Sequence, residues 1–188
     1  MIEFRLDPAR FPDASATIPA RERLQRMLRE RAYLNPGLKL YLCWKGEKEE
    51  LFYEKSGIDA YVGELAGDGK IFPKVAHFDN PDDSEIRVSV AVAWTKGYGR
   101  DNVLGFCNCV RQPEGGTHVT GLRLAMPGIV RKYIEDNSLL AAKDKDLKIE
   151  GSDCFEGVYA IVSIKHRSPV FKGQAKPTLA NPDAPRAL

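Results

Sequence analysis

The sequence has no long hydrophobic run and little net charge. No stretch of its 188 residues approaches the roughly 18 consecutive apolar residues that a membrane-spanning helix needs. The N-terminus also lacks the pattern of a secretory signal. Lysine and arginine (28) nearly balance aspartate and glutamate (26), and a formal net charge of +2 is too small to indicate a nucleic-acid or membrane partner by itself. We therefore expect a cytoplasmic protein.

Cysteine and histidine are also few, and their spacing does not indicate a metal site. The four cysteines are Cys43, Cys107, Cys109 and Cys154. Cys107 and Cys109 would place both sulfurs on one face of a strand, but no second pair or histidine cluster supplies further ligands. We interpret the cysteines as buried strand residues and predict no metal.

The sequence contains no phosphate-binding loop of the GxxxxGKS/T type. His118 could act as a general base, but no serine, cysteine or carboxylate constellation is indicated around it. The alternative is that His118 holds the neighbouring glycine corner by hydrogen bonding. We predict no catalytic residue in this chain.

The most informative stretch that is present runs from Asp101 to Arg123. Residues 103–110 are mostly apolar and bounded by turn signals, which predicts a buried strand. Pro113 ends the strand because proline cannot donate to the ladder. Gly115 and Gly116 allow positive φ, and Thr117 is a candidate N-cap for the helix that follows. This stretch therefore predicts a strand, a tight corner and a helix.

Apolar periodicity and turn residues predict further elements along the chain. Residues 85–95 alternate strictly between apolar and other side chains, which is typical of a half-buried antiparallel strand. The remaining predicted elements are a helix over 20–34, hairpin strands over 38–45 and 50–54, a short helix over 56–65, and strands over 72–78 and 158–165.

The helix after Thr117 contains Pro127 in its apolar pattern. A proline inside a helix removes one backbone hydrogen bond and clashes one turn back, at a cost of about 3 kcal/mol. We predict a kink between Arg123 and Pro127, with the helix maintained by tertiary packing.

Several of these residues resemble the transducer domain of the ATPase subunit of bacterial type IIA topoisomerases, the gyrase B and topoisomerase IV ParE family. They are Asn102, the sequence Gly115-Gly116-Thr117-His118 after a strand, Gly121-Leu122-Arg123 in the next helix, and the Asp153-x-x-Glu156-Gly157 segment. The resemblance covers most of the chain. It implies an α+β fold, a two-layer sandwich of a four-stranded mixed sheet with helices on one face. It also implies the left-handed crossover of a ribosomal-protein domain, against the usual right-handed preference.

The same resemblance implies three parts of the chain. Residues 1–36 would be the last strand and helix of the ATP-binding domain, and residues 37–180 would be the transducer domain. Residues 181–188 would be a flexible tail, because prolines crowd the C-terminal region.

The resemblance assigns a chemical role to the loop around Lys176. The family's lysine at this position reaches the γ-phosphate of ATP bound in the neighbouring domain, with a glutamine beside it that corresponds to Gln174. A lysine suits this role because it is a mobile point charge. The family's threonine is replaced by Ala175, and Pro177 is expected to restrain the Lys176 backbone to extended conformations. ATP and Mg are therefore expected cofactors of the complete subunit and not of this chain alone.

Positive residues are candidate contacts to DNA. Arg111, Arg131 and Lys132 could face the phosphates of a transported duplex, and the arginine-rich helix over 20–34 could do the same. The alternative for each is an ordinary solvated charge. The implied partners are DNA, the rest of the ATPase subunit, a DNA-cleaving subunit of the gyrase A or ParC type, and a second copy in a homodimer, in a nucleoid-associated location.

The implied function is to couple ATP binding and hydrolysis to DNA-gate closure and strand passage. The ATP pocket and the DNA-cleaving parts are not in this sequence, so we expect the chain alone neither to hydrolyse ATP nor to cut DNA. Two alternatives remain open. The chain could be a stand-alone nucleic-acid-binding module of the same fold, or an inactive truncated copy.

Overall fold

The computed structural model describes residues 7, 9–10, 20–44, 46–80, 85–97, 102–140 and 149–187. The chain forms two compact units, Met1–Lys55 and Ser56–Leu188. This division falls later than the boundary expected after residue 36, so the hairpin after the first helix belongs to the first unit. Among the described residues, no helix combines the length and the apolar composition needed to cross a membrane.

In the first unit, polar side chains join one helix to one hairpin. The elements are α2 (Arg21–Leu34), β1 (Leu40–Leu42) and β2 (Glu50–Phe52), and β1 pairs with β2 in antiparallel fashion. Arg21 forms ion pairs with Glu47 and Glu50. Gln25 Nε2 also donates a hydrogen bond to Glu50 Oε2 at 2.7 Å. The predicted helix and hairpin are confirmed. The first arginine of the basic helix, Arg21, pairs with glutamates of the first unit.

The second unit is built on a mixed sheet of five strands. Its order is β3-β4-β7-β5-β6, in which β5 and β7 are parallel and all other neighbours are antiparallel. The elements are α3 (Ile58–Ala66), β3 (Ala76–Asp79), β4 (Ile86–Trp94), β5 (Asn102–Cys107), β6 (Val110–Gln112), α4 (Thr117–Asp136), β7 (Val158–His166), β8 (Phe171–Lys172) and β9 (Thr178–Leu179), with short 3-10 turns at η1 (Gly67–Gly69), η3 (Asp153–Phe155) and η4 (Ala184–Ala187).

The prediction of four strands was wrong because the strand predicted over 103–110 ends at Cys107, as β5, and a separate strand, β6, begins at Val110. β5 and β6 are joined by the two-residue turn Asn108-Cys109, in which both residues have positive φ, 51° and 63°. Two positive φ values are the mark of a tight hairpin turn whose twist matches its strands. The turn also corrects the cysteine prediction, since Cys109 lies in the turn and does not share a strand face with Cys107.

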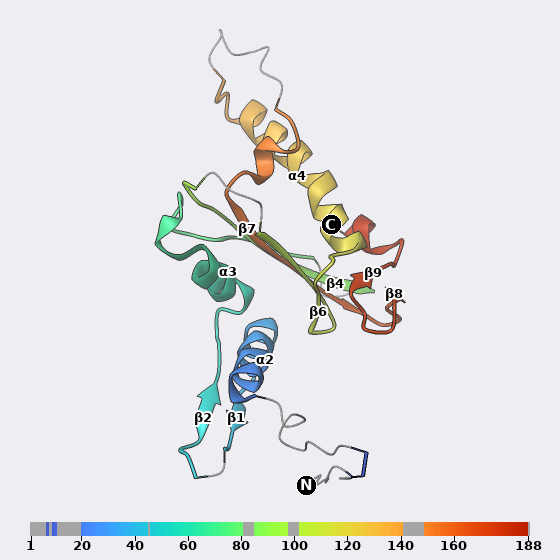
Figure 1. Cartoon of the computed structure of the whole chain (residues 1–188). Coiled ribbons are helices and arrows are strands. Elements are labelled where there is room, and N and C mark those ends of the chain that lie inside the picture. Colours follow the sequence, from blue (N-terminus) through green and yellow to red (C-terminus); the bar gives the residue numbers. More distant parts are fainter. Residues whose placement is uncertain are drawn as a thin grey trace. The chain divides into compact units, whose positions relative to one another are not determined.

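Helices cover both faces of the sheet, so the prediction of a two-layer sandwich with helices on one face was also wrong. α3 and α4 lie on opposite sides of the sheet (Figure 1). On the α3 side, the ring of Tyr61 lies 6.4 Å from that of Phe106. On the α4 side, Leu122 packs in one core with the valines of β4.

The physical reason lies in the small residues of β4. Ala91 and Ala93 are 0% and 3% exposed and point to the α3 side, opposite to Val90 and Val92. Because side chains alternate along a strand, the face predicted to be solvated consists partly of alanines, which allow a helix to approach closely. The alternation in β4 and β7 is therefore confirmed, but both of its faces are buried.

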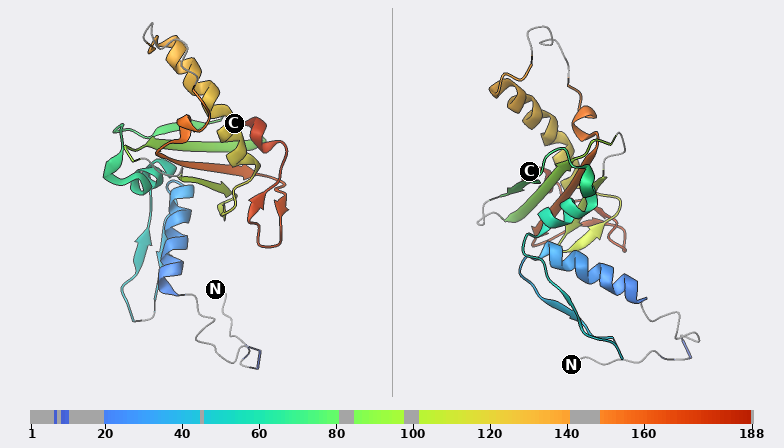
Figure 2. Two further views of the ribbon diagram at one scale, coloured as in Figure 1. Left: turned by 45° about the horizontal axis from the view of Figure 1, so that its top comes forward. Right: turned by 90° about the vertical axis from the view of Figure 1, so that its left-hand side faces the viewer.

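α4 is one continuous helix that runs through Pro127, so the prediction that the helix is maintained is confirmed, and the kink between Arg123 and Pro127 stays a prediction. Its buried residues all lie in the first half, up to Met126. The second half extends beyond the sheet (Figure 2) and exposes Ile129 and Tyr133. Pro127 has no N–H to donate within the helix, but α4 nevertheless continues to Asp136.

The C-terminal stretch differs from the loose tail that its prolines predicted. Asn181 is 5% exposed, and Ala184 is completely buried in the main core. The Asn181 side chain accepts a hydrogen bond from the Val170 N–H at 2.6 Å and donates to Ser168 O at 3.2 Å. Buried polar and apolar contacts thus hold the described part of this stretch in place.

His77 joins α3 to the edge strand β3. Its Nδ1 lies 2.5 Å from Asp59 Oδ1 on α3, and its Nε2 lies 2.9 Å from Asp79 Oδ2 on β3. Burial acts to lower the pKa of His77, but the hydrogen bonds to Asp79 and Asp59 outweigh burial and raise the pKa above its ordinary value. The charged imidazolium therefore stabilises the contact between helix and strand.

We expect this contribution of His77 to be present below pH 6.5 and lost as the pH rises through the raised pKa. NMR titration of the ring should give a pKa above 6.5, and Asp59→Asn and Asp79→Asn should each lower that pKa. In the unmodified chain the unfolding free energy should decrease as the pH rises above 6.5, and in His77→Gln this decrease should be absent. A ring pKa unchanged by both aspartate substitutions would contradict this arrangement.

Candidate functional site

The hairpin β8–β9 presents Gln174 and Lys176 at an exposed tip. The Lys176 N–H donates to Gly173 O at 3.2 Å, which closes the loop into a tight turn. Lys176 has a φ of +56°. The expectation of an extended backbone before Pro177 was therefore wrong, because closure of the turn overrides the local preference.

The Lys176 side chain folds back on its own hairpin. Its Nζ lies 5.4 Å from the centroid of the Phe171 ring, within the range of a cation–π interaction. Such a contact at an exposed site is worth about 0.5–1 kcal/mol, which is small compared with pairing to a phosphate. An anion that binds the ammonium group can therefore draw it away from the Phe171 ring.

The corner before α4 is built from two glycines with positive φ. Gly115 has a φ of 72° and Gly116 has a φ of 143°. Gly116 occupies the N-cap position and Thr117 is the first residue of the helix, with its hydroxyl buried and without a partner among the described residues. The predicted N-cap role of Thr117 was therefore wrong. α4 has no side-chain cap hydrogen bond at its N-terminus, and Thr120 Oγ1 donates to Gly116 O at 3.1 Å.

His118 is completely buried against the sheet. Its ring lies over Gly105 of β5, where an added Cβ would come within 2.3 Å of His118 Nε2. Burial lowers the pKa of His118 to about 4, so the ring is neutral at physiological pH. Neither ring nitrogen has a hydrogen-bond partner among the described residues. The structure therefore contradicts the proposed hydrogen-bonding role, and His118 acts as a packing residue of the corner.

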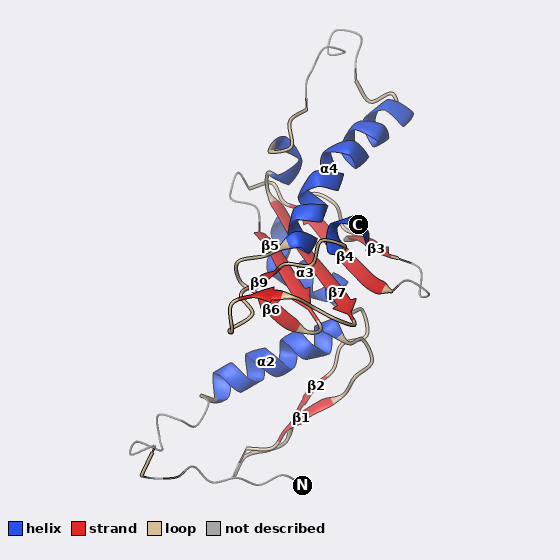
Figure 3. Ribbon diagram, turned by 90° about the vertical axis from the view of Figure 1, so that its right-hand side faces the viewer, coloured by secondary structure: helices blue, strands red, loops and turns tan. Residues whose placement is uncertain are grey.

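The corner lies against the hairpin that carries Lys176. Gly116 bridges to Leu179, and the Leu179 N–H donates to Gly115 O at 3.2 Å. A Cβ on Gly116 would lie 2.5 Å from both the nitrogen and the oxygen of Leu179, so only glycine allows this approach. Figure 3 shows β6 and β9 side by side next to the start of α4. Sequence reasoning singled out the corner and the lysine loop separately but missed their contact.

The candidate DNA-facing residues lie on separate elements. Arg111 is on the edge strand β6, and its side chain points to the α3 side, as Phe106 opposite it does. Arg131 and Lys132 are on the second half of α4, on the other side of the sheet, and Arg131 Nη2 donates to Ile149 O at 3.0 Å. The structure thus brings Arg131 and Lys132 together but not Arg111.

The interpretation of the cysteines as buried strand residues holds for Cys107 only, since Cys43 follows β1 and Cys154 lies in the 3-10 turn η3. Cys107 and Cys154 are buried, and burial raises the pKa of the Cys107 thiol to about 11. Cys43 is exposed. In the part of the chain that the structure describes, no three His, Cys, Asp or Glu side chains are grouped to hold a metal ion.

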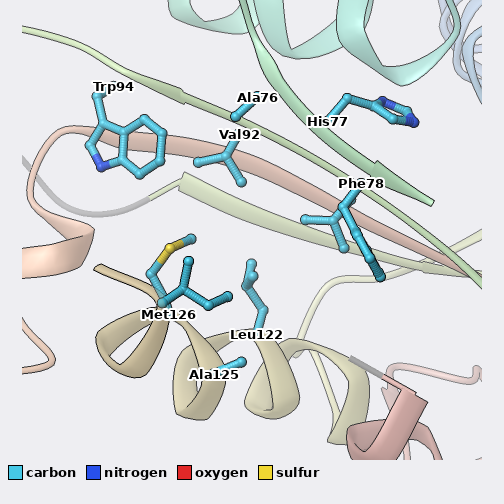
Figure 4. A pocket seen from close by; sticks show the side chains of 10 residues that line it. Ala76, His77, Phe78, Val92, Trp94, Leu122, Ala125 and Met126 are labelled. Atoms are coloured by element: carbon cyan, nitrogen blue, oxygen red, sulfur yellow. The ribbon is translucent and has the colours of Figure 1, made fainter. Parts of the chain in front are cut away.

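An apolar groove of about 310 Å³ lies between α4 and strands β3 and β4. Phe78, Val92 and Trp94 line it from the sheet, and Leu122 and Met126 line it from α4 (Figure 4). The His77 side chain points away from the α4 residues. Apart from His77, the residues that line the groove are apolar or aromatic.

Comparison with known proteins identifies the family. The model of the family described as DNA gyrase B matches residues 57–188. The chain belongs to the DNA gyrase B family.

Both gyrase and topoisomerase IV subunits are among the similar proteins. The chain is 35% identical over 185 residues to the DNA gyrase B protein of Streptococcus pneumoniae, covering 96% of this chain. It is 36% identical over 191 residues to the B-type subunit of DNA topoisomerase 4 from Bacillus subtilis, covering 100% of this chain. In both cases the chain spans 28% of the relative's length.

A solved structure of a gyrase B has the same arrangement of elements. The 43K ATPase domain of Thermus thermophilus gyrase B, in complex with an aminocoumarin, superimposes with a TM-score of 0.82 at 31% identity. The match covers 97% of this chain and 48% of that chain. The mixed α+β architecture is therefore that of a segment of gyrase B.

Proposed function

We propose that this chain is the transducer segment of a type IIA topoisomerase ATPase subunit, with the left-handed crossover of the transducer and ribosomal-protein-like fold. In the complete subunit it couples ATP binding and hydrolysis to DNA-gate closure and strand passage. The observation that carries the proposal is the exposed position of Lys176 on a hairpin whose base is hydrogen-bonded to the start of α4. A phosphate that attracts Lys176 would also shift the β8–β9 hairpin. Because the hairpin is hydrogen-bonded to the residues before α4, this shift would displace the start of α4.

Lys176 and Gln174 are the residues of this chain that fit a terminal phosphate of ATP. Both are exposed at the hairpin tip, and Lys176 supplies a positive charge while Gln174 supplies an amide. The described residues contain no metal-ligand cluster. Mg and the other phosphate contacts would therefore come from elsewhere in the complete subunit.

DNA, a DNA-cleaving partner subunit and a second copy of the subunit are the proposed macromolecular partners. Arg131 and Lys132 are adjacent and exposed on the part of α4 that extends beyond the sheet. Lysine and arginine contacts to phosphates position a protein on a duplex without reading sequence. This geometry supports Arg131 and Lys132 as DNA-facing residues, with Arg111 as a separate contact on β6.

The test of the proposed function is Lys176→Ala in the complete ATPase subunit. Loss of a preorganised charge next to a reacting phosphate costs about 3 kcal/mol or more in comparable sites, which corresponds to about a hundredfold in rate. We expect steady-state ATP turnover to fall by at least about tenfold.

The matched control is Lys172→Ala. Lys172 is an exposed lysine on strand β8 of the same hairpin, but not at its tip. Its removal changes net charge equally and should leave turnover within about twofold of the unmodified subunit. Equal turnover in Lys176→Ala and Lys172→Ala would refute the proposed contact with ATP.

A further inference from the structure

Glu114 holds the segment that directly follows Lys176. Thr178 Oγ1 donates a hydrogen bond to Glu114 Oε2 at 2.9 Å, and the Glu114 N–H donates to Pro177 O at 3.1 Å. The next residue, Leu179, donates its N–H to Gly115 O at 3.2 Å. Three consecutive residues after the lysine are therefore bonded to two consecutive residues of the corner.

Lys176 itself is in a backbone conformation that needs such support. Its φ of +56° lies in the left-handed region, which a non-glycine residue rarely adopts. A strained conformation of this kind persists only when the surrounding structure determines it from both sides. On one side the Lys176 N–H is bonded to Gly173 O, and on the other side the corner holds Pro177 and Thr178.

The hydrogen bond between the side chains of Glu114 and Thr178 is the part of this clamp that a substitution can remove without disturbing a glycine. A hydrogen bond to a carboxylate is stronger than one between neutral groups. The accepting Oε2 reaches β9 from a residue 64 positions away in the sequence. The Glu114 side chain thus adds an exposed contact to the backbone hydrogen bonds that hold β9 against the corner, and Lys176 is two residues from the bonded hydroxyl.

We propose that Glu114 is a positioning residue for Lys176, which fixes the backbone conformation from which the lysine side chain reaches the terminal phosphate. This inference rests on the proposed function, in which Lys176 contacts ATP. It goes beyond that function because it assigns to the corner a residue that acts on ATP turnover without touching the nucleotide.

The experiment measures kcat and KM for ATP in the complete ATPase subunit. Misplacement of a contacting group by about 1 Å costs up to about a hundredfold in rate, so we expect Glu114→Ala to lower kcat by about tenfold. Glu114→Gln keeps an oxygen that accepts from Thr178 and should restore kcat to within about threefold. Glu135→Ala, an exposed glutamate on the second half of α4, is the control and should have no effect.

The double variant separates positioning from general stability. In the Lys176→Ala background, Glu114→Ala should lower kcat no further, because the group that it positions is already gone. An equal loss in both backgrounds would overturn the inference, since it would show that Glu114 acts independently of the lysine. Amide hydrogen exchange of Leu179 should also rise in Glu114→Ala, and an unchanged rate would overturn the inference as well.

Failure of the inference and failure of the proposed function give different results. A large effect of Lys176→Ala with none of Glu114→Ala refutes the positioning role and leaves the ATP contact intact. No effect of Lys176→Ala refutes the ATP contact, and the role of Glu114 in turnover falls with it.

Discussion

Gly116→Ala is expected to destabilise the chain by about 3 kcal/mol or more. Gly116 has a φ of +143°, a conformation that residues with a side chain rarely adopt. Its added Cβ would also lie 2.5 Å from the backbone nitrogen and oxygen of Leu179. Neither atom can move without breaking the contact between the corner and β9. Urea denaturation of the variant, followed by circular dichroism, measures the loss.

Gly128→Ala is the matched control on the same helix. Nothing lies within 4 Å of the position that its Cβ would occupy. Because alanine is the better helix former, this variant should be more stable by up to about 1 kcal/mol. If Gly116→Ala changed the unfolding free energy by less than about 1 kcal/mol, as Gly128→Ala is expected to do, the described close approach of Gly116 to Leu179 would be incorrect.

Much of the fold follows from local sequence patterns. The alternation in β4 and β7 predicts two long central strands. The apolar periodicity from Val119 to Ile134 predicts α4, but only its positions up to Met126 are buried, and Ile129 and Tyr133 are exposed. These signals are reliable because the geometry of each element sets which side chains share a face. In a strand every second side chain lies on the same face, and in a helix every third or fourth does. The resemblance of the chain to the gyrase B family is confirmed by the match over residues 57–188.

The parts that could not be predicted depend on tight turns and on distant contacts. Asn108-Cys109 has no glycine to mark the turn, so the pattern over residues 103–110 predicts one strand. Small residues such as Ala91 fit either a solvated face or a closely packed helix, and only the position of α3 decides between them. The pairing of Glu114 with Thr178 joins segments 64 residues apart, which no local pattern encodes.

His118 is expected to make stability fall steeply on the acid side. The ordinary pKa of 6.5 is lowered to about 4 by burial, so between these values the unfolded chain binds a proton that the folded chain does not. Stability therefore decreases as the pH falls from 6.5 toward about 4. At about 1.4 kcal/mol for each pH unit, the loss amounts to about 3 kcal/mol. Urea denaturation at a series of pH values measures this slope.

His118→Gln removes the titrating group while keeping a polar side chain of similar size. The unfolding free energy that this variant loses between pH 6.5 and about 4 should therefore be smaller by about 3 kcal/mol. The decisive comparison is with His77→Gln, because the pKa of His77 is raised and its contribution is lost at high pH. Each substitution should alter one side of the stability profile and leave the other side unchanged. A native-state pKa of His118 near 6.5 by NMR would show that its ring is not buried as described, and the packing of the corner against Gly105 would then be wrong.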